Sequence, residues 1–172
     1  VSRRAFPLPG AVSPVLVSRS GEALVPSGKV RRRGDEWFMS SRATVRAEFT
    51  VESGGIHEIK AVVRPIQAGP EPVRMALSID GTRLAEVEVT SPSQHAFRVR
   101  TRHLLDEGVH ALGVTFLNDY YRPEAPDPAQ RDRNVIVESL QIEGPLEPTY
   151  PSRAQRRLID RFGPPEEPVI LR

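Results

Sequence analysis

The strongest constraint on the fold is an alternation of apolar and polar residues that repeats along most of the chain. In residues 45–52, Val45, Ala47, Phe49 and Val51 alternate with polar or charged residues. This period of two is typical of a β-strand with one buried face. Comparable runs, separated by turn residues, occupy residues 59–63, 73–79, 85–89, 97–100, 110–117 and 135–142. Several short strands without a helix-period segment among them predict an all-β fold, an antiparallel β-sandwich of the jelly-roll type.

Two details of the pattern predict local geometry. Asp80 and Gly81 lie between two alternating runs, which is a strong signal for a β-hairpin. The apolar positions on the two sides of residue 138 fall in opposite phases. A β-bulge near Glu138 and Ser139 would reconcile them.

The segments on either side of the alternating region have a different composition. Prolines and glycines interrupt the first 35 residues, where only Val15 to Val17 resemble an edge strand. After Gly144 and Pro145 comes a proline-rich linker, and residues 153–162 predict a short helix with apolar residues on one side. We therefore expect an irregular N-terminal extension (1–35), a β-sandwich domain (36–146) and a linker with a short C-terminal helix (147–172).

Composition excludes several functional classes. The chain has no cysteine, which rules out disulfides, thiolate zinc sites and cysteine nucleophiles. Its 24 basic and 22 acidic residues nearly cancel, so charge does not indicate nucleic-acid binding, and the short basic cluster at residues 31–33 is read as a solvated turn. No apolar run approaches the roughly 20 residues of a membrane span. No signal peptide is visible in the sequence.

Nothing in the sequence indicates catalysis. The histidines are scattered without a metal-binding spacing, and we expect His110 to be a satisfied core residue. There is no Gly-x-Ser-x-Gly nucleophile motif and no phosphate-binding glycine loop. The acidic residues gather in one loop instead of facing each other across a cleft, so we predict that the protein is not an enzyme.

That acidic loop runs from Asp119 to Asp132, with Asn118 and Asn134 at its rims, and it also contains Asp127. Loops of this length are uncommon in compact domains unless they have a function. If the two flanking strands pair, the carboxylates of Asp119 and Asp132 converge, and such hard oxygen donors suit Ca²⁺. The alternative interpretation is that Asp, Asn and Pro simply form a solvated loop.

The motifs LNDYY (117–121) and DRNVIVESLQIEGP (132–145), with GPEPVRMALSIDG and EGVHALGVTFLND before them, carry a family resemblance. Over about residues 40–146 the chain resembles the calcium-dependent xylan-binding carbohydrate-binding modules, family 60 and its circularly permuted relative, family 36. It is most similar to copies within large exported bacterial multidomain proteins that also contain cytochrome c-like domains.

The resemblance implies a non-catalytic module that binds Ca²⁺ and a polysaccharide, possibly xylan-like, outside the cytoplasm, in an extracellular, periplasmic or cell-surface location. In the family, aspartates and main-chain carbonyls hold the ion, and sugar hydroxyls complete its shell. Carried over to this chain, the metal ligands would be Asp119, Asp132 and the Arg131 carbonyl, with Asp127 and Asn134 as further candidates. The residues expected around the sugar are Asn118, Tyr120, Tyr121, Gln67 and Glu71. Tyrosines at the base of a loop can equally be packing residues.

A second interpretation treats the sandwich as a structural module for assembly. In that case residues 1–35 and 147–172 would contact neighbouring domains or subunits, and the loop would be dispensable.

Overall fold

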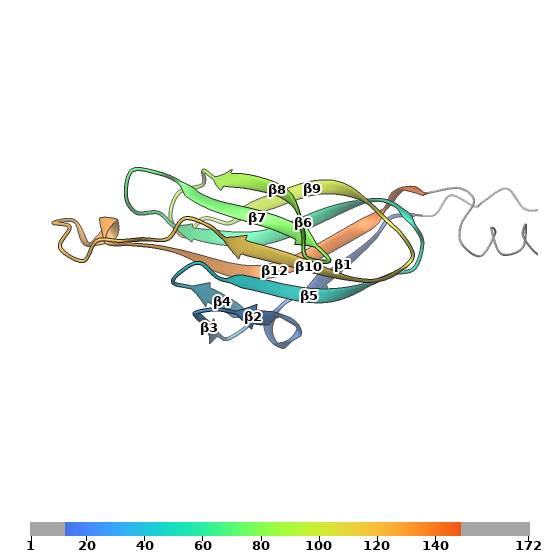
Figure 1. Ribbon diagram of the computed structural model, residues 1–172, viewed down its shortest axis with the longest axis horizontal. Helices are drawn as coiled ribbons and strands as arrows, with labels where there is room; N and C mark the ends of the chain where they lie inside the picture. The colour runs from blue at the N-terminus through green and yellow to red at the C-terminus, as the bar shows by residue number, and fades with distance from the viewer. Residues whose placement is uncertain (1–12, 149–172) are drawn as a thin grey trace, which may run out of the picture.

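Two antiparallel β-sheets pack face to face in a computed structural model that describes residues 13–148 (Figure 1). The larger sheet has the order β3-β4-β12-β6-β9, with β1 and β11 also paired to β12, and the smaller has the order β2-β5-β10-β7-β8. The elements are β1 (Val15–Arg19), η1 (Gly21–Ala23), β2 (Val25–Ser27), β3 (Val30–Arg33), β4 (Glu36–Met39), β5 (Thr44–Val51), β6 (Gly55–Ile66), β7 (Val73–Ile79), β8 (Thr82–Val89), β9 (Phe97–Leu105), β10 (Gly108–Phe116), β11 (Tyr120–Tyr121), η2 (Pro128–Gln130) and β12 (Asp132–Pro148). The predicted β-sandwich is confirmed.

The core consists of the alternating apolar residues identified in the sequence. Along β5, Val45, Ala47, Phe49 and Val51 are all buried, whereas the residues between them are exposed. Leu77 of β7 contributes a fully buried side chain from the same sheet. One apolar face per strand is therefore enough to bring the two sheets together.

Both predicted local details are present. Asp80 and Gly81 have φ angles of 50° and 81°, the positive values that a tight hairpin between β7 and β8 requires. The register between β12 and β6 passes from Val137 to Ser139, which leaves Glu138 as the extra residue of a bulge.

The N-terminal segment differs from the irregular extension that the sequence predicted. From residue 13 onward it forms three short strands: β1 pairs with β12, β3 with β4, and β2 with β5. The edge strand expected at Val15 to Val17 is confirmed as part of β1. These strands are three to five residues long, too short to show a period, and glycines such as Gly21 and Gly28, with positive φ, turn the chain between them.

Strand β12 continues to Pro148, past the Gly144–Pro145 cis peptide bond. The helix predicted at residues 153–162 lies outside the described residues. Within residues 13–148, no helix is long and apolar enough to cross a membrane.

Candidate functional site

The two-residue strand β11 pairs with the start of β12 and brings the two ends of the acidic loop together, whereas the longer flanking strands β10 and β12 lie in different sheets. Tyr120 pairs with Arg133 and Tyr121 with Asp132. Burial raises the pKa of Asp119, and the nearby charge of Asp132 raises it further. The two carboxylates are therefore close enough to repel each other. The loop projects at one end of the sandwich, on the left in Figure 1.

Four polar or aromatic side chains gather at this ribbon. Tyr121 lies opposite Asp132 in the register, Asn134 is two residues from Asp132 along β12, and Asp119 directly precedes β11. Because side chains alternate along a strand, those of Tyr121, Asp132 and Asn134 point to the same side. The charge of Asp132 raises the pKa of Asp119, so the two carboxylates are near each other. The ribbon thus presents two carboxylates, one amide and one phenol ring together.

The oxygens of this group have few partners within the described residues: a hydrogen bond from the Tyr120 N–H lowers the pKa of Asp119 against the effects of burial and of Asp132. Neither Asp119 nor Asp132 forms an ion pair with any residue of the described part. Asn134 is 4% exposed, and its Oδ1 is buried without a hydrogen-bond partner in residues 13–148. A buried acceptor without a partner costs about 1–3 kcal/mol. A hard cation would satisfy all three groups, so this donor set fits Ca²⁺.

The shell around such an ion would be only partly built from side chains. Within residues 13–148, no three His, Cys, Asp or Glu side chains are grouped closely enough to hold a metal. The further ligands must come from amide and main-chain oxygens, water or a bound sugar. The Arg131 carbonyl accepts a hydrogen bond from the Arg122 N–H at 2.7 Å and retains a second lone pair. Asp127 is used differently, because its Oδ1 accepts from the Ala129 N–H at 2.9 Å and caps η2.

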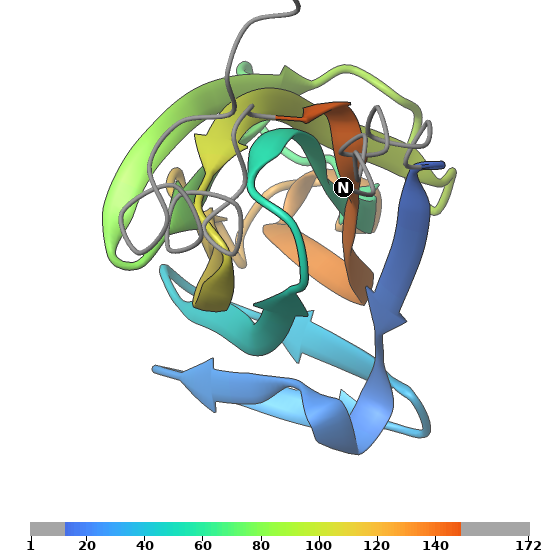
Figure 2. The same ribbon diagram turned by 90° about the vertical axis from the view of Figure 1, so that its right-hand side faces the viewer.

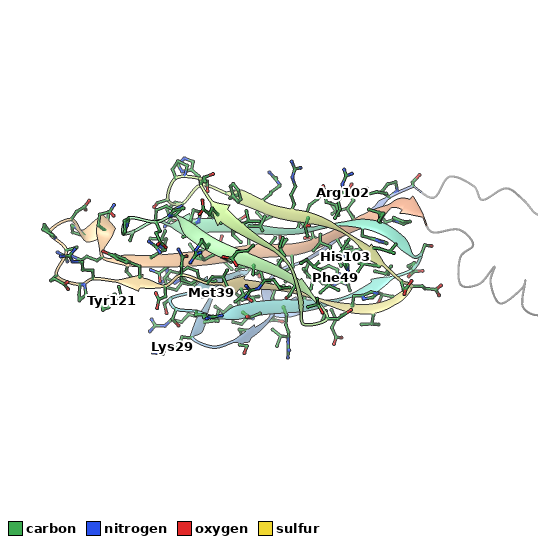
Figure 3. All side chains as sticks on the ribbon, turned by 45° about the horizontal axis from the view of Figure 1, so that its top comes forward. Lys29, Met39, Phe49, Arg102, His103 and Tyr121 are labelled. Atoms are coloured by element: carbon green, nitrogen blue, oxygen red, sulfur yellow. The ribbon has the colours of Figure 1, made fainter. Side chains whose placement is uncertain are left out.

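The two tyrosines have different surroundings. Tyr121 is 70% exposed beside Asp132 and lies at the loop end of the molecule (Figure 3). Tyr120 points to the other side, where its ring packs on Gly69: a Cβ atom at Gly69 would lie 2.8 Å from the ring. Of the two residues, only Tyr121 presents an open aromatic face to solvent.

Arg133 fixes the two loops behind the site, a role that the sequence analysis missed. Its side chain is buried, and burial lowers its pKa. The guanidinium donates to the carbonyls of Ala68 and Asn118 at 2.9 and 2.8 Å, and lies 5.3 Å from the centre of the Tyr120 ring. No pattern in the sequence marks this role, because it depends on the register that pairs Arg133 with Tyr120.

A second missed residue comes from the N-terminal segment. Lys29, in the turn between β2 and β3, lowers the pKa of Asp119 and so opposes the effects of burial and of Asp132. The short N-terminal strands therefore bring a positive charge near the acidic pair.

The other residues predicted at the sugar are engaged within the protein. Asn118 Oδ1 accepts from the Arg74 N–H at 2.7 Å. Gln67 donates from Nε2 to the Val89 carbonyl at 2.6 Å. Glu71 is exposed, and its carboxylate accepts from Asn118 Nδ2 at 3.4 Å. These contacts shape the loop that Tyr120 and Arg133 pack against.

His110 is satisfied by local contacts, but the expectation that it is a core residue was wrong, because it is only half-buried and lies at the rim of the sandwich. Its Nδ1 lies 2.8 Å from Asp80 Oδ2 and its Nε2 lies 2.9 Å from the Asp106 carbonyl. It therefore ties the β7–β8 hairpin to the turn before β10.

Comparison with known proteins agrees with this geometry. The family model described as "Ca-dependent carbohydrate-binding module xylan-binding", CBM60, matches residues 58–156, more than half of the 172-residue chain. No curated protein gives a significant match.

Three solved structures share the fold. The CBM36-1 domain of a multidomain xylanase from the hindgut metagenome of Trinervitermes trinervoides has a TM-score of 0.55 at 13% identity, covering 76% of this chain and 98% of that domain. The C-terminal CBM6 of a Zobellia galactanivorans laminarinase has a TM-score of 0.53 at 14% identity, covering 76% and 100%. A CBM36 in complex with calcium and xylotriose has a TM-score of 0.52 at 10% identity, covering 73% and 98%.

Proposed function

Because the chain belongs to the CBM60 family of calcium-dependent, xylan-binding carbohydrate-binding modules, which are non-catalytic, we propose that it binds a polysaccharide through calcium held at Asp119 and Asp132. The observation that supports this proposal is the pair of carboxylates without an ion pair in residues 13–148, beside the unpartnered Asn134 Oδ1, at the β11–β12 ribbon. Two carboxylates that raise each other's energy, next to a buried amide oxygen without a partner, form an arrangement that a divalent cation stabilises.

The residues at the ribbon would have different roles in binding calcium and the sugar. Asp119 and Asp132 would supply the charged ligands, and Asn134 Oδ1 and the Arg131 carbonyl the neutral ones. Calcium bound there would offer its open positions to neighbouring sugar hydroxyls. Tyr121, exposed opposite Asp132, would contact one face of the sugar ring. Arg133 and Tyr120 act as positioning residues, because they pack the two loops together behind the ribbon.

We further propose a xylan-like ligand and an exported location for the module. Family membership supports both. The expectation that the chain belongs to a larger protein with cytochrome c-like domains stays a prediction.

Retention on insoluble xylan, with calcium and then with excess chelator, tests the proposal. We expect retention in calcium, its loss in chelator and its recovery when calcium is restored. Asp119→Asn and Asp132→Asn should each abolish retention, and Tyr121→Ala should weaken it by roughly 1–3 kcal/mol, the size of a lost ring contact.

Glu124→Gln is the matched control. It removes an exposed carboxylate from the same loop, one that pairs with Arg122 at 3.1 Å, and it should bind as the unchanged protein does. Equal retention in calcium and in chelator, or full retention by both aspartate variants, would overturn the proposal.

A further inference from the structure

The end of the sandwich opposite the acidic loop has an open side. Strand β2 covers β5 only between Thr44 and Arg46, so no described strand pairs with the outer edge of β5 beyond Arg46. Strand β1 pairs with β12 on one side only. Figure 2 looks onto this end and shows β1 along one side of the sandwich. Two free strand edges thus flank the same opening, and free edges are normally covered.

Between these edges lies an apolar slot of about 120 Å³. Its main walls are the side chains of Val15, Val17, Phe49, Val51, Ile142 and Pro145. The slot is close in size to an apolar cavity of roughly 150 Å³ that takes up benzene. One aromatic or branched apolar side chain therefore suits its volume and its lining.

The floor of the slot is rigid. The imidazole of His57 is 4% exposed, donates from Nδ1 to the Gly55 carbonyl at 2.9 Å, and packs directly on Gly144, where a Cβ atom could not fit. The slot is therefore a built part of the fold, with a depth fixed by this contact.

The surface around the slot is apolar, with one arginine beside its wall and two carboxylates at its rim: the Arg19 guanidinium lies 5.4 Å from the centre of the Phe49 ring. Val15 is 61% exposed and Val109, which pairs with Thr50 of β5, is 64% exposed. Glu52 lines the slot, and Glu107 lies in the turn that precedes β10, whose first residue pairs with Val51. Both carboxylates are exposed, and neither forms an ion pair within residues 13–148. The surface thus suits a partner that is both apolar and basic.

The chain itself supplies such a partner directly after the described part ends. The wall residue Pro145 precedes the last described residue, Pro148, by three positions. The sequence that follows, residues 149–162, combines three large apolar side chains with four arginines and a single acid: Leu158, Ile159, Phe162, Arg153, Arg156, Arg157, Arg161 and Asp160. Ten to fourteen residues can span up to about 33–50 Å when extended, ample to return to the slot.

We propose that residues 149–162 dock onto the slot, with their apolar residues over Val15, Phe49 and Val51 and their arginines against Glu52 and Glu107. This intramolecular contact closes the open side of the sandwich. It uses the end opposite Asp119 and Asp132, so it leaves the carbohydrate site free. Its occupant is a segment of the same chain, and not a second copy or another protein.

Paired cysteines test the contact, since the chain contains none of its own. The test pair is Glu52→Cys with Arg161→Cys, and the matched control is Glu124→Cys with Arg161→Cys, whose first member lies in the acidic loop. In dilute full-length protein under mild oxidation, the test pair should form an intramolecular disulfide about tenfold faster or more than the control pair, because docking raises the effective concentration. Equal rates, or a disulfide between two copies, would overturn the proposal.

Four further variants separate the alternatives. If Glu52→Cys couples to Leu8→Cys and not to Arg161→Cys, the N-terminal residues occupy the slot and the proposal is wrong. Phe162→Ser should lower the urea midpoint of unfolding of the full chain, and Glu52→Lys should do the same. Combining Glu52→Lys with Arg161→Glu should recover most of the loss if the two charges meet. Xylan retention in calcium should be unchanged in all of these variants, so failure here is distinct from failure of the proposed function.

Discussion

Replacing Asp119 with Asn should remove the response of stability to calcium while leaving the calcium-free protein intact. The substitution preserves the shape of the side chain and removes one of two charges that repel each other across the ribbon. Without calcium, the raised pKa of Asp119 shows that its ionised form is disfavoured. The variant should therefore be as stable as the unchanged protein in chelator, or slightly more stable.

The magnitude in calcium follows from mass action. A ligand that binds only the folded state at 100 times its Kd stabilises that state by about 2.7 kcal/mol. In a chain of this size, each kcal/mol moves the Tm by roughly 2–4 °C. The unchanged protein should thus melt roughly 5–10 °C higher in saturating calcium than in chelator, and Asp119→Asn should show little or no shift.

Differential scanning calorimetry in a calcium titration measures both quantities. Asp132→Asn should behave as Asp119→Asn does, and Glu124→Gln should keep the full shift, which separates a specific loss from a general loss of negative charge. A full calcium shift in Asp119→Asn, or a marked loss of its stability in chelator, would show that this carboxylate serves the fold and not the ion.

Three other predictions concern the framework of the site. Leu77→Ala should lower the free energy of unfolding by about 3 kcal/mol in urea titrations, because Leu77 is fully buried between the sheets; a loss below 1 kcal/mol would mean that the core collapses around the cavity. Burial lowers the pKa of His110, but its bonds to Asp80 and the Asp106 carbonyl outweigh this and raise it, whereas the Ala111 N–H and His110 lower the pKa of Asp80 against the effect of burial. The contact between His110 and Asp80 should therefore stabilise the fold most between the ordinary pKa values of the two groups, about pH 4 to 6.5. Its contribution should fade below about pH 4 and as pH rises through the raised pKa of His110. The difference in the free energy of unfolding between the protein and His110→Gln should peak in that range, and a pH-independent difference would contradict the prediction. Gly69→Ala should lower the free energy of unfolding by about 1–3 kcal/mol and weaken xylan retention, because Gly69 has a φ of 73° and the new methyl group would meet the Tyr120 ring. Unchanged stability in calorimetry and unchanged retention would show that the ring moves freely.

Much of the fold could be predicted because it depends on local patterns. The alternation in β5 fixes which face is buried, the Asp80–Gly81 turn fixes one hairpin, and the phase change around Glu138 fixes a bulge. Each of these features depends on only a few consecutive residues. The strands of residues 13–35 could not be predicted in the same way, because they are too short to show a period and are stabilised by pairing with β12, β4 and β5.

The candidate site was also only partly predictable from the sequence. The approach of Asp119 to Asp132 could be inferred only on the condition that the two flanking strands pair; β10 and β12 lie in different sheets, and the short strand β11, which has no pattern of its own, joins the loop ends instead. The roles of Arg133, Lys29 and Gly69 depend on which segments meet in space, and residues far apart in sequence carry no local sign of that. The roles of Gln67 and Asn118 could not be predicted for the same reason. As polar loop residues they suit a ligand, but in the structure their amides form hydrogen bonds with main-chain groups.

The three short strands before residue 36 have a practical consequence for anyone who isolates this module. A shortened chain that starts where the alternating pattern becomes obvious would lose β1, β2 and β3 together. It would uncover Met39, Phe49 and the flank of β12, invite sheet-to-sheet association between copies, and remove Lys29, whose charge lowers the pKa of Asp119. Weak glycan retention by such a fragment would reflect damaged architecture, and the binding properties of the module are therefore best measured on a chain that begins before residue 13.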